Sequence, residues 1–540
     1  MRPFLPALSR VNTSGEIHAH RYWTAVTVTL ATMLELLDTS IVNVAIPHMM
    51  GSLGATLDEV AWVSTGYVVA NVIVLPISGW LANFFGRRNY FALSILIFTL
   101  ASFFCGNADS LGGLVFWRII QGLGGGGLIA TANATLYEVF TPEEASQSIA
   151  IFGLGIMIGP TLGPTVGGWI TDTYSWPWIF YINLPLGALA MIAALMVVPD
   201  SRYAQRVSQI DWAGLLLLIL GIGCLQTLLE RGERLDWLES REIFTYVLVS
   251  STALTAFVWH ELRHRHPIVE LRILRDAQFS VSLIFTFLLG AALYSTVFIL
   301  PVYIQTLLGY SAWETGLVIL PGALSSGITM ALMGRIITRS NLDLRFYVVL
   351  GAVIFGLSMW QHGQFTTLTG NEDFLWPLIL RGVGLGMVFI PLNNLALGNL
   401  PPEQIANGSG LYNLTRQLGG SVGIAASATT LIQLQQVNRG ELLNHVGNLS
   451  PPALERLAKL KAYFITHGIP ALTAEKKALA LLDRQVLQQA SMLSFDRLFL
   501  YFGIALLAAL PLLLLMNRTQ FQRRTTTPAA TPVSDSPTQP

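Results

Sequence analysis

The stretch GYVVANVIVLPISGWLANFFGRR, from Gly66 to Arg88, decides the fold of this 540-residue chain. It is predominantly apolar over about 20 residues, the length with which a helix crosses a bilayer core about 30 Å thick, and it ends on two arginines. Runs of this size recur from Trp23 to Met516 with short polar breaks. The pattern predicts an all-α membrane protein with fourteen transmembrane helices.

Composition supports a membrane location and excludes other classes. Hydrophobic residues make up 53% of the chain and charged residues 11%, against about 25% charged in an average soluble domain. The 31 basic and 31 acidic residues cancel, so nothing in the charge balance indicates a nucleic-acid partner. Cys105 and Cys224 lie inside apolar runs, where a small buried hydrophobe is the ordinary interpretation.

The fourteen spans are expected to be helical and about as long as the bilayer is thick. They are expected near 24–47, 59–82, 89–107, 111–138, 146–171, 177–198, 211–230, 242–260, 279–306, 313–337, 344–362, 374–399, 405–432 and 496–516.

The basic residues predict the orientation of the spans. With the N-terminus in the cytoplasm, 17 of the 31 basic residues lie on the cytoplasmic side, while the short outer loops hold only Arg231, Arg234 and Arg241. An odd number of helices would place Arg518, Arg523 and Arg524 outside and would spoil this asymmetry. The sequence therefore predicts a multi-pass membrane protein with both termini in the cytoplasm.

An internal repeat predicts the organisation of the spans. Gly66 to Arg88 resembles GLVILPGALSSGITMALMGRIITR, from Gly316 to Arg339, and the helix with Arg118 resembles the helix with Arg381. Two six-helix halves around a site at the bilayer midplane are the expected build of a rocking transporter. We expect a cytoplasmic segment at 1–23, an N-terminal six-helix bundle at 24–198, a linker with two extra helices at 199–278, a C-terminal bundle at 279–516 and a disordered cytoplasmic tail at 517–540.

The longest loop, 433–495, is expected outside the cytoplasm and carries all four lysines of the chain. Its helical hydrophobic spacing predicts one or two amphipathic helices. Two interpretations remain open, a hairpin lying on the membrane surface and a docking site for a partner.

Charged residues inside the spans are the first functional candidates, because burying a charge in the bilayer costs about 2.5–3.5 kcal/mol on insertion scales. The four leading candidates are Asp38, Arg118, Arg381 and Arg416. With a rise of 1.5 Å per residue, Asp38 lies about 9 Å and Arg118 about 10 Å below the outer edge of the bilayer core. We expect Asp38 to carry the proton, with Arg118 stabilising its charged form when close; a static ion pair that fixes helix packing is the alternative.

Other polar residues in the spans form a weaker set of candidates. Glu35, one turn before Asp38, is a second proton site or a carboxylate lining a wet cavity. Substrate contacts are expected from polar and aromatic side chains, each of which interhelical hydrogen bonding also explains. They are Tyr67, Asn71, Gln121, Tyr294, Arg381, Asn393, Asn394, Asn413, Arg416 and Gln417.

Five motifs, taken in order, resemble those of the fourteen-helix drug:proton antiporters of the major facilitator superfamily, and most closely the EmrB-type multidrug exporters. They are LLDTSIVNVAIP (36–47), GWLANFFGRR (79–88), FWRIIQGLG (116–124), GLGIMIGPTLGPTVGG (153–168) and WPWIFYINLPLG (176–187). The resemblance covers nearly the whole chain and implies the major facilitator fold. One departure is Asn83, where the superfamily loop motif usually has Asp, so a charge relay at that position is in doubt.

Two motifs have expected mechanical roles. Gly155, Gly159, Gly163, Gly167 and Gly168 allow close helix packing, while Pro160 and Pro164 kink the helix; the family resemblance implies a gate that resists leak. On the cytoplasmic side, the motif with Gly79, Asn83 and Gly86 ends at Arg87 and Arg88, which are expected to pair with Glu138. Charges that only set topology are the alternative.

The resemblance implies proton-driven export of hydrophobic or amphiphilic small molecules across the bacterial inner membrane. It also implies lipid, protons and substrate as partners, together with an EmrA-type periplasmic adaptor and a TolC-type outer-membrane channel. The alternatives are an exporter of one endogenous compound, such as a siderophore or fatty acid, and an assembly subunit of an efflux complex. No cofactor, metal or nucleic acid is expected. His260, His264 and His266 have helical spacing suited to a metal, but polar residues beside the membrane are commoner. No phosphate-binding GxxxxGK[ST] motif and no catalytic constellation appears, so neither an ATP-driven pump nor an enzyme is expected.

Overall fold

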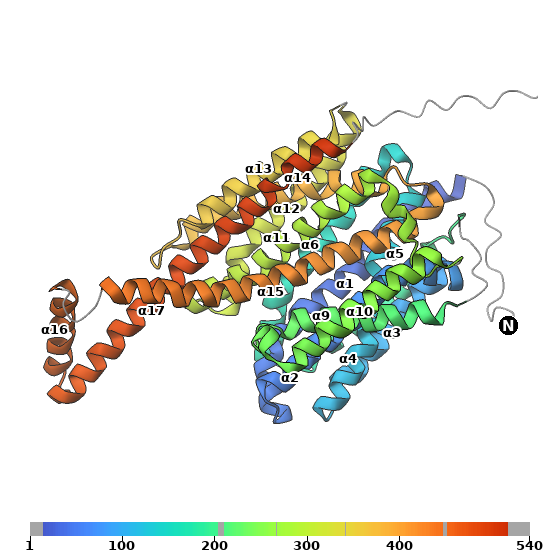
Figure 1. Cartoon of the computed structure of the whole chain (residues 1–540). Helices are drawn as coiled ribbons and strands as arrows, with labels where there is room; N and C mark the ends of the chain where they lie inside the picture. The colour runs from blue at the N-terminus through green and yellow to red at the C-terminus, as the bar shows by residue number, and fades with distance from the viewer. Residues whose placement is uncertain (1–14, 204–209, 266, 341, 446–450, 517–540) are drawn as a thin grey trace, which may run out of the picture.

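The computed structural model describes residues 15–203, 210–265, 267–340, 342–445 and 451–516, and these residues form helices and connecting loops without a strand (Figure 1). The first part of the predicted N-terminal segment, residues 1–14, and the predicted tail, residues 517–540, lie outside the described residues. Thirteen described segments are long and apolar enough to cross a membrane. The prediction of an all-α membrane protein is therefore confirmed.

Eight helices form the first six predicted spans, because the fourth and sixth spans are each divided into two helices. They are α1 (Gly15–Leu53), α2 (Leu57–Phe85), α3 (Arg87–Gly106), α4 (Leu111–Gly125), α5 (Leu128–Val139), α6 (Pro142–Thr173), α7 (Trp178–Tyr181) and α8 (Asn183–Val197).

Glycines explain how closely the fourth span, which α4 and α5 form, approaches its neighbours. A Cβ atom at Gly126 would lie 2.4 Å from the carbonyl oxygen of Asn71 in α2, and one at Gly124 would lie 2.7 Å from the backbone nitrogen of Phe98 in α3. Only residues without a side chain allow backbones to come so close. The glycine run therefore brings α4, with Arg118 and Gln121, close to α2 and α3.

The remaining helices form the inserted pair, the second half and the long loop. The pair is α9 (Trp212–Arg231) and α10 (Arg241–Arg263), and the others are α11 (Ala277–Leu307), α12 (Ala312–Arg339), α13 (Leu344–His362), α14 (Asn371–Leu397), α15 (Ile405–His445), α16 (Pro451–Thr466) and α17 (Ala471–Ala508). Short 3₁₀ turns lie at 237–239, 271–275, 402–404 and 510–515.

The two halves resemble each other at the N-termini of their second helices. The second helix of each half begins with a capping box, formed by Thr56 and Glu59 in α2 and by Ser311 and Glu314 in α12. In each box the hydroxyl and the carboxylate satisfy backbone N–H groups that the helix leaves free. The two halves therefore share local structure as well as hydropathy.

The predicted span 405–432 is the one that is not strongly apolar. It forms the first part of α15, whose glycines, serines and asparagines lie between α11 and α2 instead of facing lipid. Gly290 of α11 illustrates the packing, since a Cβ there would lie 2.1 Å from the Arg416 carbonyl oxygen. A helix enclosed by protein does not need an apolar surface, so this span completes the fourteen.

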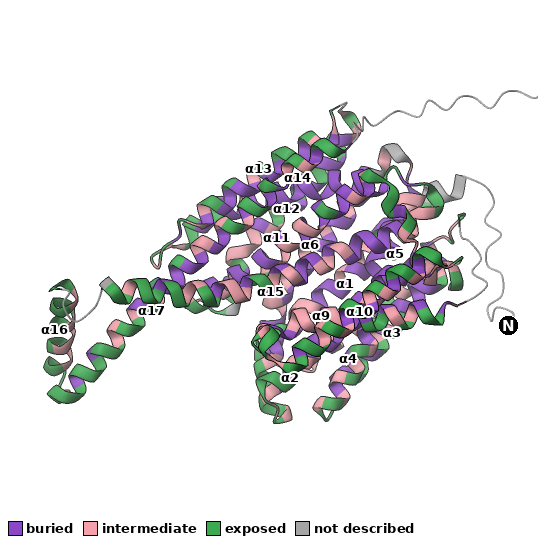
Figure 2. Ribbon diagram, in the orientation of Figure 1, coloured by how far each residue is buried: buried purple, intermediate pink, exposed green. Residues whose placement is uncertain are grey.

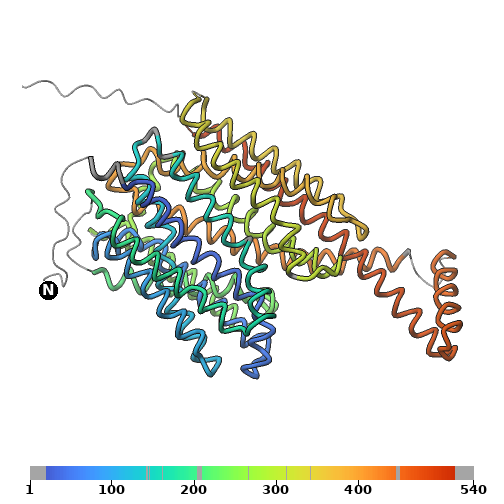
Figure 3. The backbone as a smooth tube through the Cα atoms, turned by 180° about the vertical axis from the view of Figure 1, so that it is seen from behind, coloured from blue at the N-terminus to red at the C-terminus, as the bar shows by residue number. Residues whose placement is uncertain are grey.

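The long loop contains the predicted helical segments, with α16 as one separate helix. It differs in that the flanking helices extend into 433–495, since α15 continues to His445 and α17 begins at Ala471. Figures 1 and 3 show α16 and the adjoining ends of α15 and α17 projecting away from the other helices, and Figure 2 shows that this part is largely exposed. We call residues 439–483 the arm. Its base is joined by an ion pair between Arg439 and Asp483 at 2.7 Å.

The longest interface within the first half joins α1 to α6 through the predicted glycine motif. Cβ atoms at Gly159 and Gly167 would lie 2.9 Å from Leu36 Cβ and 2.6 Å from Ile41 Cγ1, respectively. A Cβ at Gly163 would lie 2.7 Å from Ser40 Cβ. This close contact fixes the segment of α1 that carries Asp38.

The two halves contact each other mainly along α6 and α12 and where α2 and α5 meet α15. We call the end of the bundle that holds Arg87 the basic end and the opposite end, which carries the arm, the arm end. Near the basic end, the Tyr137 hydroxyl of α5 donates to Asn393 Oδ1 of α14 at 2.8 Å. In Figure 1 the helices of the two halves converge around α5 and diverge toward the arm end.

Candidate functional site

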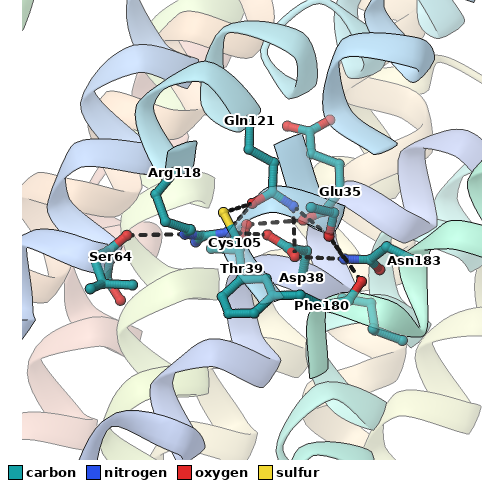
Figure 4. A network of polar contacts seen from close by, with 12 residues as sticks. Glu35, Asp38, Thr39, Ser64, Cys105, Arg118, Gln121, Phe180 and Asn183 are labelled. Atoms are coloured by element: carbon teal, nitrogen blue, oxygen red, sulfur yellow. Dashed lines mark hydrogen bonds and ion pairs between the residues drawn. The ribbon is translucent and has the colours of Figure 1, made fainter. Parts of the chain in front are cut away.

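Asp38 lies at the centre of a polar cluster in the first half, fully buried on α1 (Figure 4). One carboxylate oxygen, Oδ2, accepts a hydrogen bond from Arg118 Nη1 at 2.5 Å. The other, Oδ1, accepts from Gln121 Nε2 at 3.0 Å and from Asn183 Nδ2 at 2.8 Å. The donors come from two helices, since Arg118 and Gln121 belong to α4 and Asn183 begins α8. A third helix, α3, orients the two amides, because each donates to Ser102 Oγ.

Arg118 is held on all sides and is 1% exposed. Its Nε donates to the Val63 carbonyl oxygen of α2 at 3.1 Å, and Nη1 also donates to Gln121 Oε1 at 2.8 Å. The guanidinium carbon lies 4.1 Å from the centre of the Tyr67 ring, within range of a cation–π interaction. The geometry thus ties the charge on Asp38 to the relative positions of α1, α2 and α4.

The helix rise predicted that Asp38 and Arg118 lie at a similar depth in the bilayer, and the structure places the two side chains in contact. The sequence did not single out Asn183 or Ser102. The only signal for Asn183 is an amide next to the apolar start of the sixth span, in YINLP, and many spans carry such a residue. Both residues are fully buried and bond to each other at 3.0 Å.

Glu35 lies one turn before Asp38 and is 2% exposed. Its Oε1 accepts from Asn71 Nδ2 of α2 at 2.7 Å, while Oε2 has no hydrogen-bond partner among the described residues. Glu35 is therefore separate from the donors around Asp38. An unsatisfied carboxylate oxygen in the bilayer interior is costly unless the group holds a proton.

A small cavity of about 40 Å³ lies between the halves, where α6 of the first half meets α11, α12 and α14 of the second. Its wall includes Arg381, Tyr294 and Ser326 together with Met157 and Pro160 of α6. Ligand pockets for drug-sized molecules have volumes of about 300–1,000 Å³, so this space admits such a molecule only after the helices move apart.

Arg381 and Arg416 are buried cations that form no ion pair with a carboxylate of the described residues. The Arg381 side chain is 6% exposed and makes no hydrogen bond or ion pair with the part of the chain that the structure describes. Arg416 is 1% exposed, its Nε and Nη1 lack partners within the described ranges, and its guanidinium carbon lies 5.7 Å from the Phe389 ring centre. Arg118 of the first half is paired with Asp38, whereas these two arginines of the second half form no ion pair within the described residues.

The other predicted substrate residues lie outside the cavity wall. Tyr67, Asn71 and Gln121 belong to the surroundings of Arg118 and Glu35. Asn393 and Asn394 both accept from the Tyr137 hydroxyl, and Asn394 also donates to Ser146 at 3.0 Å. Asn413 donates to the Ser409 carbonyl at 2.9 Å within α15, and Gln417 is half-buried.

The glycine motif of α6 faces α1 and α12. A Cβ at Gly155 would lie 2.5 Å from Thr29 Cγ2, and the Gly159, Gly163 and Gly167 contacts are those described above. The Gly168 carbonyl accepts from Thr171 at 3.1 Å. Pro160 lines the cavity, and Pro164 lies one turn further along the same helix.

At the basic end, Arg87 forms an ion pair with Glu138 at the end of α5. Glu138 also accepts from Ser201 Oγ at 2.8 Å and from the Arg202 N–H at 2.6 Å. Arg88 does not contact Glu138, and its backbone N–H instead donates to Asp200 at 3.1 Å. Glu138 thus joins α3, α5 and the segment after α8.

The rest of the predicted gate motif shapes the backbone. A Cβ at Gly79 would lie 2.9 Å from the Asn407 backbone nitrogen of α15, and Gly86 has a φ of +83°, which favours glycine. Asn83 is half-buried, and its side chain makes no hydrogen bond within the described residues. The motif therefore combines a tight turn, a close helix contact and the Arg87 ion pair.

Comparison with known proteins decides the family. The family model described as Major Facilitator Superfamily matches residues 28–424. The chain belongs to the major facilitator superfamily. Membership makes it a multi-pass membrane transporter, as the apolar helices predicted.

Relatives within the superfamily place the chain in the EmrB-type branch. It is 31% identical to the multidrug export protein EmrB of Escherichia coli strain K12 over 88% of this chain and 91% of that protein. It is 34% identical to EmrB of Haemophilus influenzae, over 78% and 83% of the two chains. It is 31% identical to the fatty acid resistance protein FarB of Neisseria gonorrhoeae, over 91% and 95%.

Solved structures confirm the superfamily fold. The human organic anion transporter MFSD10 aligns with a TM-score of 0.56 at 13% identity, over 90% of this chain and 99% of that chain. A double-tryptophan mutant of XylE aligns with a TM-score of 0.59 at 12% identity, over 93% and 97%. These similarities show the fold and carry no statement about substrate.

Proposed function

We propose that this superfamily member exports hydrophobic or amphiphilic small molecules across the bacterial inner membrane in exchange for protons, with Asp38 as the proton carrier. The observation that carries the proposal is the contact between Asp38 and Arg118, a carboxylate and a guanidinium 0% and 1% exposed in side chain. The names of the relatives, multidrug export protein and fatty acid resistance protein, support export as the direction. The basic end is then the cytoplasmic end, in line with the distribution of arginines.

Proton coupling follows from the dependence of Asp38 on several helices. Donation from Arg118, Gln121 and Asn183 favours the charged carboxylate, and each donor belongs to a helix other than α1. A movement that separates α4 or α8 from α1 removes donors and favours uptake of a proton. Glu35, with one unpartnered oxygen on the same helix, is a second proton site in this scheme.

Alternating access requires contacts that hold one end closed. Arg87 with Glu138, Tyr137 with Asn393, and Gly79 against α15 join helices near the basic end. In the proposed cycle these contacts close the cytoplasmic side while the arm end is open. The glycine contacts between α1 and α6 transmit the movement, because two helices that pack this closely move together as one rigid pair.

Arg381 defines the proposed substrate site. It lies in the cavity wall between the halves, and its side chain lacks a partner among the described residues, so a substrate that carries an acidic group would satisfy it. The apolar wall, including Met157 and Pro160, suits the hydrophobic part of such a molecule. The same site suits a single endogenous acid such as a fatty acid, which is the alternative substrate class.

An Asp38→Asn variant tests the proton carrier. In inverted vesicles with an imposed proton gradient, we expect it to lose proton-driven substrate uptake, because the amide accepts no proton at this position. Asp172→Asn, which changes an exposed carboxylate at the end of α6, is the matched control and should transport normally. Full proton-driven uptake by Asp38→Asn would refute the assignment, and loss of uptake only in Glu35→Gln would move the carrier to Glu35.

An Arg381→Gln variant tests the substrate site. A hydrogen bond to a charged group contributes about 1.5–3 kcal/mol, so binding of a hydrophobic acid should weaken about tenfold or more. Binding of the corresponding neutral amide should change little. Arg335→Gln, at an exposed position of α12, is the matched control. Equal weakening for acid and amide, measured by isothermal titration, would contradict the acid-recognition role.

The arm supports a second proposed role, assembly with an EmrA-type adaptor and a TolC-type channel. It projects from the arm end, which is periplasmic in the proposed orientation, and its surface is largely exposed. Because Arg439 and Asp483 meet at its base, a short Gly/Ser linker can replace residues 440–482.

We expect the protein with the linker to keep proton-driven transport in vesicles and to lose whole-cell resistance. The Asn438 contact with Ser494 at 2.8 Å lies below the cut and should keep α15 and α17 together. Unchanged whole-cell resistance would contradict the assembly role. Loss of vesicle transport would show that the arm serves the transport cycle itself.

A further inference from the structure

A cluster of metal-ligating side chains lies at the basic end of the inserted pair, away from the transport site. Asp211 is the N-cap of α9, His260 lies in the last turn of α10, and His264 is the C-cap of α10. Asp211 Oδ2 is 2.7 Å from His260 Nε2 and 3.4 Å from His264 Nδ1, and one ligand atom of each residue lies within 4.8 Å of the others. The imidazole rings stack with their centres 5.1 Å apart.

A second buried carboxylate points into the same place. Glu261 is 1% exposed; its Oε2 accepts from the Val269 N–H at 3.4 Å, while Oε1 has no hydrogen-bond partner among the described residues. Glu261 Oε1 and Asp211 Oδ2 lie 2.6 and 2.8 Å from the position that a Cβ on Gly214 would take, so they are neighbours. Two adjacent carboxylates in a buried setting are unfavourable without a cation or a proton between them.

The donor set and its spacing match a transition-metal site. Two histidines four residues apart lie on one face of a helix, and imidazole nitrogen and carboxylate oxygen bind Zn²⁺ at about 2.0–2.2 Å. Ligand atoms around a tetrahedral ion with such bonds are about 3.4 Å apart, which is the observed Asp211 to His264 separation. The shorter contact to His260 is a hydrogen bond whose proton the ion would replace.

We propose that Asp211, His260 and His264 bind a divalent transition-metal ion of the Zn²⁺ type, with Glu261 as a fourth or outer ligand. The ion would join the first turn of α9 to the last turn of α10 and to the segment at Val269 that leads into α11. The spacing of the histidines suits a metal, but nothing in the sequence pointed to Asp211 as a further ligand, because it lies 49 residues before His260. His266, the third histidine of the sequence cluster, lies outside the described residues.

Metal titration of the full-length protein without a histidine tag tests the site. After treatment with a chelator, the detergent-solubilised protein should bind one Co²⁺ with visible d–d absorption bands, and Zn²⁺ should displace the Co²⁺ and raise the thermal unfolding midpoint. Absence of a saturable Co²⁺ spectrum and of a Zn²⁺-dependent shift would show a hydrogen-bonded cluster only and would overturn the proposal.

Two variants localise the binding. Asp211→Asn keeps an N-cap side chain while removing the charge, and His264→Gln changes a half-exposed residue, so both should fold. Each should weaken Zn²⁺ binding at least about tenfold, as loss of even an outer ligand does. His48→Gln, which removes an exposed histidine of α1, is the control and should bind normally. Unchanged affinity in both cluster variants would contradict the assignment.

Discussion

The burial of one ion pair, Asp38 with Arg118, constrains the first half of this transporter. A charge in the bilayer interior is costly, and removing one partner of a buried pair costs about 3–5 kcal/mol, so the helices around the pair must hold its hydrogen-bonding partners at fixed positions. The glycines of α6 and of the fourth span let backbones come close enough for this. The close packing of the helices is therefore needed to bury the ion pair.

The second half does not repeat that arrangement. Arg381 occupies the place in the repeat that Arg118 occupies in the first half, yet no carboxylate among the described residues faces it. The asymmetry divides the work between the halves in our account. The first half holds a charge that a proton can neutralise, and the second half holds a charge that a substrate can neutralise. In our account a proton reaches Asp38 only when the helices around it separate. A drug-sized substrate reaches Arg381 only when the helices move apart, because the cavity there is only about 40 Å³.

The sequence predicted the elements whose physical cause is local. Hydropathy located the spans, the basic residues required an even number of them, and the rise per residue brought Asp38 level with Arg118. It did not predict that α15 and α17 continue beyond the membrane, because hydropathy falls where lipid ends while the helix does not. It also missed Asn183 and Asp211. Their roles depend on residues of other helices, and these spatial neighbours cannot be predicted from a single amide or carboxylate in one sequence.

Infrared difference spectroscopy of the purified protein, with and without substrate, tests the central claim that Asp38 exchanges its proton as the helices around it move. We predict a carboxyl C=O band that changes on substrate addition in the wild-type protein, is absent in Asp38→Asn and persists in Glu35→Gln. A band that survives unchanged in Asp38→Asn would contradict the account and would leave the Asp38 and Arg118 contact as a static element of helix packing.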